Sequence, residues 1–229
     1  MIIDKTYIIN LEHRTDRKEK MIHELKRIGI NNYEFFKGII PKEEEMNEWN
    51  PNFIDPMPDW FLQTNGDFYK YKLGSLGCMK SHYQIIKQAY ENNYENIFIM
   101  EDDTEFLTNE TLNNILDKFK PQLDSIENYF GILYFSGNHL GSKLKKITPN
   151  ISLVKGTLTT GSYIINRRAM KLIIDNINHY NREIDVYYST ILQNQIPCFC
   201  FIPHLTNQYS NFSDILQKNV SYNLKHTIH

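Results

Sequence analysis

The chain has 229 residues, of which 41% are hydrophobic and 23% are charged. Its 25 Lys and Arg residues stand against 27 Asp and Glu residues, which leaves a formal net charge of -2. Proteins that bind DNA or RNA concentrate positive charge against the phosphates, so this composition argues against a nucleic-acid partner. The length suits one large domain, which buries roughly 70% of the surface of its unfolded chain. We therefore expect a single domain over residues 1–229.

The first residues are Met-Ile-Ile-Asp-Lys, and the charges of Asp4 and Lys5 interrupt the segment before an apolar core typical of a signal peptide can form. No run approaches the roughly 18 apolar residues of a transmembrane helix. The chain has three cysteines, and because an odd number cannot all pair in disulfides, they suit a reducing compartment. We expect a cytoplasmic protein, from a bacterium or the host cell of a large virus, with no signal peptide and no transmembrane segment.

The first part of the chain alternates strand and helix patterns. Residues 1–10 predict a strand, residues 15–28 a helix that Gly29 ends, and residues 33–37 a second strand. This β-α-β order predicts parallel strands with helices on the faces of the sheet. Residues 41–71 combine prolines with many aromatic side chains, and we expect a long irregular excursion that covers the core or contacts an acceptor.

The middle of the chain predicts a helix that runs to about Tyr90, after a tight backbone at Gly74 and Gly77. The wholly apolar residues 97–100 predict a central strand that is buried on both faces. The remaining patterns predict, in chain order, a helix over 112–119, a strand over 132–135, a basic hairpin through Lys146, strands over 151–154 and 162–165, helices over 167–177 and 184–192, and a strand over 197–202. The polar tail, residues 216–229, is expected to be loose.

Three consecutive carboxylates, Glu101, Asp102 and Asp103, directly follow the predicted central strand. Ligands of open α/β sheets bind outside the carboxyl ends of the strands. Adjacent carboxylates repel one another unless a cation or hydrogen-bond donors balance them, and oxygen ligands favour Mg²⁺ or Mn²⁺. We therefore expect a metal site in a solvent-facing acidic cluster. A solvated acidic turn without a metal is the alternative.

Motifs spread over about residues 5–215 resemble those of glycosyltransferase family 25, the type of the bacterial lipo-oligosaccharide and collagen galactosyltransferases. These motifs are Tyr7-Ile8-Ile9-Asn10-Leu11-x-x-Arg14-x-Asp16-Arg17, Gly74-x-x-Gly77-Cys78-x-x-Ser81-His82, Met100-Glu101-Asp102-Asp103, Thr160-Gly161-Ser162-Tyr163, Ile184-Asp185 and Gln208-x-Ser210-x-x-Ser213-Asp214-Ile215. The resemblance implies a GT-A-type, Rossmann-like α/β fold with a mostly parallel central sheet flanked by helices. It places a nucleotide-sugar half at about residues 1–105 and an acceptor-binding, closing half at about 106–215.

The resemblance also implies an activity: transfer of a hexose, galactose or glucose, from a UDP-sugar to a glycan or a hydroxylated protein side chain. Mn²⁺ or Mg²⁺ is the implied cofactor, because it offsets the charge that grows on the leaving UDP. Asp103 would ligate the metal, Glu101 would be a ligand or a ribose and water contact, and His204 or Gln208 would complete the metal shell.

Contacts to the donor are expected from side chains at the strand ends and the loops on the same edge of the sheet. These residues are Asn10, Leu11, Arg14, Arg17, Ser81, His82, Asp102, Gln208, Ser213 and Asp214. Two of them have a structural alternative. Arg17 can instead form an ion pair with Asp16 or Glu101, and His82 can be a packed structural histidine.

An inverting transferase needs a base beside the acceptor hydroxyl. Asp185 is the first candidate and Glu183 the second, although Asp185 also suits the first turn of a helix as a capping residue. Two other functions stay open from the sequence. One is a catalytically inactive module that binds a sugar nucleotide or a glycan, and the other is a nucleotidyltransferase, which also uses acidic strand ends.

Overall fold

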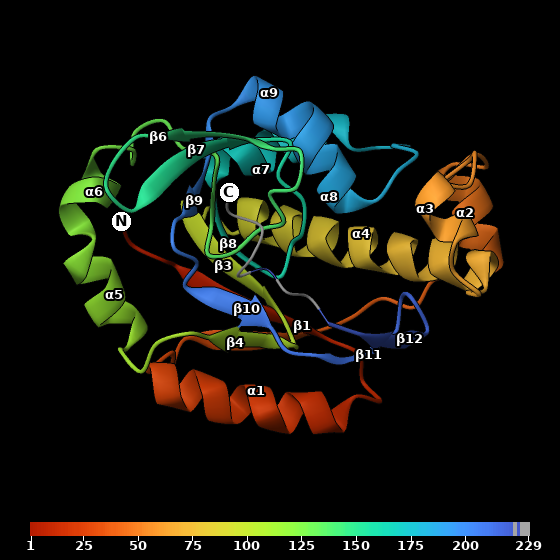
Figure 1. Ribbon diagram of the computed structural model, residues 1–229, viewed down its shortest axis with the longest axis horizontal. Coiled ribbons are helices and arrows are strands. Elements are labelled where there is room, and N and C mark those ends of the chain that lie inside the picture. Colours follow the sequence, from red (N-terminus) through yellow and green to blue (C-terminus); the bar gives the residue numbers. More distant parts are fainter. Residues whose placement is uncertain (222–223, 225–229) are drawn as a thin grey trace.

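A mixed sheet forms the centre of the molecule in this computed structural model, which describes residues 1–221 and 224. Among these residues the sheet has eight strands in the order β2-β1-β3-β8-β5-β9-β7-β6 (Figure 1). The strands are β1 (Lys5–Asn10), β2 (Tyr33–Lys37), β3 (Asn96–Glu101), β5 (Ile132–Tyr134), β6 (Lys143–Lys146), β7 (Ile151–Lys155), β8 (Ser162–Asn166) and β9 (Cys198–Phe201). Only β7 and β8 run against the direction of the others. The predicted α/β fold with a mostly parallel central sheet is confirmed.

Helices cover both faces of this sheet, and each face has its own hydrophobic core. The helices of one face are α1 (Thr15–Ile28), α5 (Leu112–Lys118) and α6 (Lys120–Asp124). The helices of the other face are α4 (Phe68–Glu91), α7 (Arg167–Asn176), α8 (Ile184–Tyr187) and the π-helix η1 (Tyr188–Leu192). Neighbours such as Tyr7 and Ile8 of β1 belong to different cores because successive residues of a strand point to opposite faces. Figure 1 accordingly shows α1 and α4 on opposite sides of the strands.

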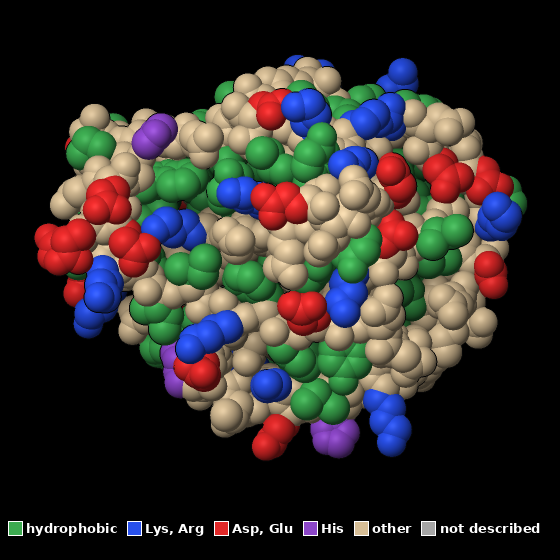
Figure 2. All heavy atoms as spheres, turned by 180° about the vertical axis from the view of Figure 1, so that it is seen from behind, with side chains coloured by type: hydrophobic (Ala, Val, Ile, Leu, Met, Phe, Trp, Pro, Cys, Tyr) green, Lys and Arg blue, Asp and Glu red, His purple; other side chains and the backbone are tan. Residues whose placement is uncertain are grey.

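The remaining elements are short. They are the helices α2 (Glu43–Trp49), α3 (Asp59–Leu62) and α9 (Gln193–Gln195), and the strands β4 (Thr104–Phe106), β10 (Thr206–Gln208), β11 (Asn211–Ser213) and β12 (Lys218–Val220). β10 pairs with β4 and β11 with β12, each antiparallel. No helix in residues 1–221 or at 224 has the length and apolar character needed to cross a membrane. On the face drawn in Figure 2, basic and acidic side chains are interspersed.

Three local predictions differ in whole or in detail from the structure. The 41–71 excursion is partly helical, because Met46 is buried in the core while Trp49 packs against it. The predicted helix over 184–192 is confirmed as helical, with a change from α-helix to π-helix at Tyr188. In the tail, residues 218–220 form β12 and are not loose, while the prediction for 222–223 and 225–229 lies outside the described residues.

The start of α4 is the fourth correction, since Gly74 and Gly77 lie inside this helix and not before it. The helix begins at Phe68 because the carboxylate of Asp67 accepts hydrogen bonds from the backbone N–H groups of Tyr69 and Lys70. Gly77 serves a close approach instead. A Cβ atom at this position would lie 2.3 Å from the backbone oxygen of Ile39.

We therefore expect Gly77→Ala to lower the free energy of unfolding by about 1–3 kcal/mol, because an added methyl group forces the backbone of residue 39 away from α4. Gly74→Ala is the matched control. Both changes gain about 1 kcal/mol of helix propensity, but the Cβ at position 74 would lie 3.1 Å from its nearest atom, in Ile215. Urea denaturation measures both variants. A Gly77→Ala variant as stable as the wild type would contradict the close approach.

Candidate active site

The carboxyl ends of β1 and β3 meet at one edge of the sheet. The two strands are parallel neighbours with Ile9 opposite Glu101, so Asn10 lies beside the acidic run. β2 lies on the other side of β1, and this reversal of strand order is where open α/β sheets bind ligands. β8 runs antiparallel to β3, with Ser162 opposite Met100, and so brings Thr160 to the same edge.

Asp102 is held by two donors from the first β-α unit. Nδ2 of Asn10 donates to one carboxylate oxygen and Nη1 of Arg17 to the other, both at 2.7 Å. Nη2 of Arg17 also donates to the backbone oxygen of Phe212 at 2.6 Å. Burial raises the pKa of Asp102, and the positive charge of Arg17 opposes that shift. Arg17 is thus paired with Asp102, not with Asp16 or Glu101, and its Nη1 lies 3.6 Å from an oxygen of Asp103.

Glu101 and Asp103 converge on the side chain of Gln208. Its Nε2 donates to Glu101 at 2.9 Å and to Asp103 at 3.0 Å, and Oγ1 of Thr160 donates to the second oxygen of Glu101 at 2.8 Å. Gly161 leaves room for this amide, because a Cβ there would lie 3.0 Å from Cδ of Gln208. Two carboxylates that already share one donor are placed to share a cation.

The prediction of a solvent-facing acidic cluster is wrong, since Asp102 and Asp103 are only 6% and 7% exposed. β10 pairs with β4 just after the acidic run, and the backbone N–H of Tyr209 donates to the backbone oxygen of Asp103. Burial, followed by the charge of Glu101, raises the pKa of Asp103 to about 7. Three carboxylates thus share the one guanidinium of Arg17, and this crowding favours the protonated form of Asp103 unless a cation binds. Buried oxygen donors with an excess of negative charge fit Mg²⁺ or Mn²⁺.

His82 lies beside this cluster and is fully buried. Its Nδ1 is 2.8 Å from the hydroxyl of Tyr163, and its Nε2 is 3.6 Å from an oxygen of Glu101. Burial acts to raise the pKa of Glu101, but the neighbouring imidazole of His82 and the hydroxyl of Thr160 hold it below its usual value. His82 thus packs as a structural histidine and also supports the anionic form of Glu101.

Two cavities adjoin at Glu101. The first has a volume of about 460 Å³ and lies between the segments after β1 and β2 and the helix α4, with Leu11 and Ile39 in its wall. The second has a volume of about 370 Å³ and is lined by Trp60 and Asp185 among others. Glu101, with Cys78 and Ile215, lines both. Of the three carboxylates, Glu101 thus stands between two binding spaces, Asp102 lines the first, and Asp103 lies behind them, bonded to Gln208.

Asp185 and Glu183 both line the second cavity, but their surroundings differ. The carboxylate of Asp185 accepts backbone N–H bonds from Thr159 at 3.3 Å and from Val186 at 2.9 Å. Burial, followed by the charge of Glu183, raises its pKa to about 6. Both oxygens of Glu183 are engaged, one by the hydroxyl of Tyr71 and the other by Nε of Arg182 at 3.1 Å. Both oxygens of each carboxylate thus accept hydrogen bonds, those of Asp185 from backbone N–H groups and those of Glu183 from side chains.

Three of the residues predicted to contact the sugar-nucleotide donor form hydrogen bonds with the protein backbone or with another side chain. The hydroxyl of Ser81 donates to the backbone oxygen of Gly77 at 2.7 Å and accepts from the N–H of Ile39 at 2.9 Å. The hydroxyl of Ser213 accepts from the N–H of Leu216 at 3.1 Å. Asp214 accepts from Nη1 of Arg14 at 2.6 Å. This last pair ties the segment after β11 to the loop after β1.

His204 has neighbours other than the carboxylates. Its Nε2 faces Nε2 of His139 at 3.0 Å, in a group that includes Cys200. Gln208, the alternative that the sequence left open, is the residue that reaches Glu101 and Asp103. Sequence reasoning assigned no individual role to His139 or Thr160, and it included Trp60 only in the aromatic 41–71 segment expected to cover the core or contact an acceptor. Thr160 precedes the predicted strand over 162–165, which is the signal that could have placed it at the acidic edge.

Comparison with known proteins gives the family. The sequence model of Glycosyltransferase family 25 (LPS biosynthesis protein) matches residues 3–188. The chain belongs to glycosyltransferase family 25. Of the predicted site residues, those from Asn10 to Asp185 lie inside the matched range, and His204, Gln208, Ser213 and Asp214 lie beyond it.

Curated relatives of this family 25 chain are much longer proteins. It is 31% identical over 106 residues to Procollagen galactosyltransferase 1-A of Xenopus laevis. This alignment covers 46% of this chain and 17% of the relative. It is 25% identical over 184 residues to Procollagen galactosyltransferase 2 of Mus musculus. This second alignment covers 76% of this chain and 28% of the relative. The chain thus spans less than a third of these relatives. Among solved structures, that of apo-UDP-glucose pyrophosphorylase resembles this chain with a TM-score of 0.47 and 9% sequence identity. The match covers 87% of this chain and 90% of the other, and it is too distant to bear on function.

The buried pair of Arg17 and Asp102 predicts a large loss of stability for Arg17→Met. Removing the guanidinium leaves Asp102 and Asp103 buried without their cation, and we expect a loss of about 3 kcal/mol in the free energy of unfolding near neutral pH. The deficit should shrink toward acid, because the orphaned carboxylates then bind protons more tightly in the folded than in the unfolded chain.

Lys171→Met is the matched control, because it removes a cation from an exposed pair with Asp175. Such pairs contribute less than about 0.5 kcal/mol. Urea denaturation at about pH 8 and about pH 5 compares the two variants. Equal, small losses in both would contradict a stabilising role for the buried pair.

Proposed function

We propose that this chain transfers a hexose, galactose or glucose, from a UDP-sugar to a hydroxyl group of a glycan or of a hydroxylated protein side chain. The observation that carries the proposal is the placement of Glu101 of the carboxylate cluster between two cavities, with Asp185 in the wall of the second. Membership of glycosyltransferase family 25 supports the reaction class. The names of the two procollagen galactosyltransferases support galactose as a donor sugar and a hydroxylated protein as an acceptor.

The first cavity is proposed to hold the nucleotide part of the donor. Its apolar wall, which includes Leu11, Ile39 and Leu73, suits the flat face of a base. A diphosphate beside Glu101 and Asp103 would meet like charge, so its binding there requires a cation. These two carboxylates would hold Mn²⁺ or Mg²⁺. The amide oxygen of the Gln208 side chain can serve as a further ligand of the ion. When bound, the ion neutralises charge on the diphosphate of the leaving UDP.

The second cavity is proposed to hold the acceptor. Trp60 and Tyr71 give it an aromatic wall, and aromatic faces suit sugar rings. Asp185 would take the proton of the acceptor hydroxyl while that oxygen bonds to the anomeric carbon and the bond from this carbon to the UDP oxygen breaks. Attack from the side opposite to UDP inverts the anomeric centre. Asp185 must be ionised for this role, and its raised pKa makes it a stronger base than an exposed aspartate.

Asp185→Asn tests this assignment, because it removes the base and leaves the shape of the side chain. We expect kcat/KM for UDP release to fall by about 10²–10⁴, with unchanged affinity for the UDP-sugar. The wild-type rate should fall as the pH drops below about 6, where Asp185 becomes protonated. UDP release from UDP-galactose and UDP-glucose, with glycans and hydroxylysine peptides as acceptors, measures these effects.

Glu183→Gln is the control, since that side chain is already bound to Tyr71 and Arg182. We expect it to retain most of the rate. Near-normal turnover in Asp185→Asn would place the base elsewhere. Binding of the UDP-sugar by the wild type without turnover toward any acceptor would favour the inactive binding module over a transferase.

A further inference from the structure

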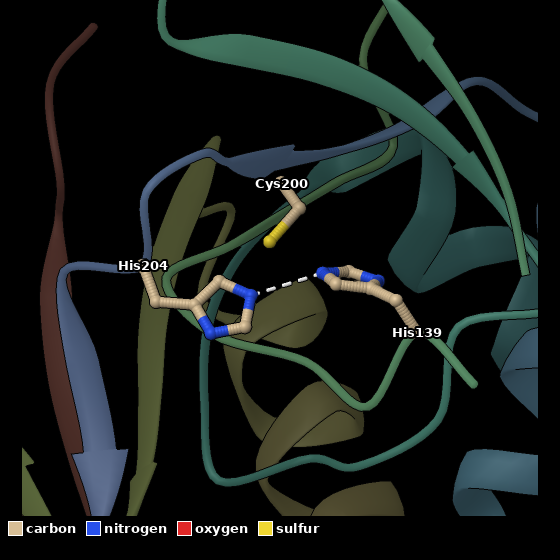
Figure 3. Close-up of side chains that lie close together, drawn as sticks. All are labelled: His139, Cys200 and His204. Atoms are coloured by element: carbon tan, nitrogen blue, oxygen red, sulfur yellow. Dashed lines mark hydrogen bonds between the residues drawn. The ribbon is translucent and has the colours of Figure 1, made fainter. Parts of the chain in front are cut away.

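A second group of metal-binding side chains lies away from the carboxylate cluster. It consists of His139, between β5 and β6, Cys200 on β9, and His204, between β9 and β10. Nε2 of His139 lies 3.0 Å from Nε2 of His204, and the three possible ligand atoms lie within 4.8 Å of one another. Figure 3 shows the sulfur of Cys200 pointing toward the space between the two rings. Three separate segments therefore bring their ligand atoms to one point.

The site is enclosed by protein. His139 is 4% exposed, His204 is 6% exposed, and Cys200 has no exposed surface. Burial lowers the pKa of each histidine to about 4, so both rings are neutral at physiological pH. A neutral imidazole carries the lone pair that binds a metal ion.

The hydrogen bonds around His139 favour a lone pair on the nitrogen that faces His204. Nδ1 of His139 is 2.9 Å from Oγ1 of Thr157, which itself donates toward Oγ of Ser142 at 3.4 Å. Thr157 then accepts the Nδ1 proton of His139, and Nε2 of that ring is left unprotonated. In metal sites such a partner on the far nitrogen fixes the tautomer and orients the ring. A lone pair on Nε2 of His139 faces His204 and needs either a proton from that ring or a cation.

We propose that His139, Cys200 and His204 bind a zinc ion, with a water molecule as the fourth ligand. Two imidazole nitrogens and a thiolate are ligands that suit zinc, whereas Mg²⁺ and Mn²⁺ prefer oxygen. At tetrahedral zinc, two nitrogen ligands at about 2.0–2.1 Å lie roughly 3.3–3.4 Å apart. The observed pair needs to open by only a few tenths of an ångström. Cys200 loses its proton to solvent on binding, so one proton is released for each ion.

The ion would fix one wall of the second cavity. Asn138, next to His139, lines that cavity and exchanges two backbone hydrogen bonds of 3.0 Å with Leu158, which lines it too. Binding at His139 would tie this wall to β9 through Cys200. The role is structural, because none of the three ligands lines either cavity around Glu101.

Cobalt substitution tests the proposal, because Co²⁺ in a tetrahedral site with a thiolate gives an intense charge-transfer band. We expect the metal-free wild type to bind one equivalent of Co²⁺ with that band, to lose the band when one equivalent of Zn²⁺ is added, and to melt at a higher temperature with Zn²⁺. Cys200→Ser should abolish the band. Cys198→Ser is the matched control, since Cys198 is equally buried on the same strand and its sulfur donates to the backbone oxygen of Ile196.

A second pair of variants keeps the test decisive if Cys200→Ser does not fold. His139→Gln should also lose the band, and Asp103→Asn should keep it, which separates this site from the carboxylate cluster. Absence of the band in folded wild-type protein, or its survival in His139→Gln, would overturn the proposal. The two histidines would then be joined by a simple N–H···N hydrogen bond, with the hydroxyl of Thr157 turned to donate to His139.

Discussion

The buried contact between Arg17 and Asp102 is the interaction on which the arrangement of the site depends. It joins α1 to the end of β3, and the second Nη atom of Arg17 reaches the backbone of Phe212 in β11. Three elements far apart in sequence are thereby fixed at one edge of the sheet. Because Asp102 is held from the side of β1, its neighbours Glu101 and Asp103 are left to converge on Gln208. Breaking the contact would disturb the site and the stability of the fold together.

The two clusters of possible metal ligands differ in chemistry. Glu101 and Asp103 supply oxygen atoms, and Glu101 lines two cavities, which suits an ion that meets a diphosphate. His139, Cys200 and His204 supply nitrogen and sulfur in an enclosed place, and none of the three lines either cavity around Glu101. Hard and borderline ions would sort between the two by ligand type alone. On our account, one ion takes part in substrate binding and the other stiffens the wall of the acceptor cavity.

Local patterns predicted the part of the fold that local physics determines. The β1-α1-β2 unit, the buried strand β3 and the acidic run after it all follow from periodicity, capping and strand ends. They also put Asn10, Arg17 and Gln208 close to the carboxylates, as the family motifs imply. The pairing of His204 with His139 depends on a contact between residues 65 positions apart, and no local pattern encodes it. The start of α4 was missed for another reason: its cap, Asp67, lies within the proline-rich and aromatic stretch in which no helix was expected.

The most direct test of the central claim is a thermal-shift comparison of UDP-, GDP- and CMP-sugars, each with and without Mn²⁺, on the wild type and on Asp103→Ala. A ligand that binds only the folded chain raises its melting temperature by mass action. Our account predicts a shift with a UDP-hexose that requires Mn²⁺ and disappears in Asp103→Ala. No shift with any nucleotide sugar, or an equal shift in the variant, would contradict a metal-dependent donor site at the carboxylate cluster.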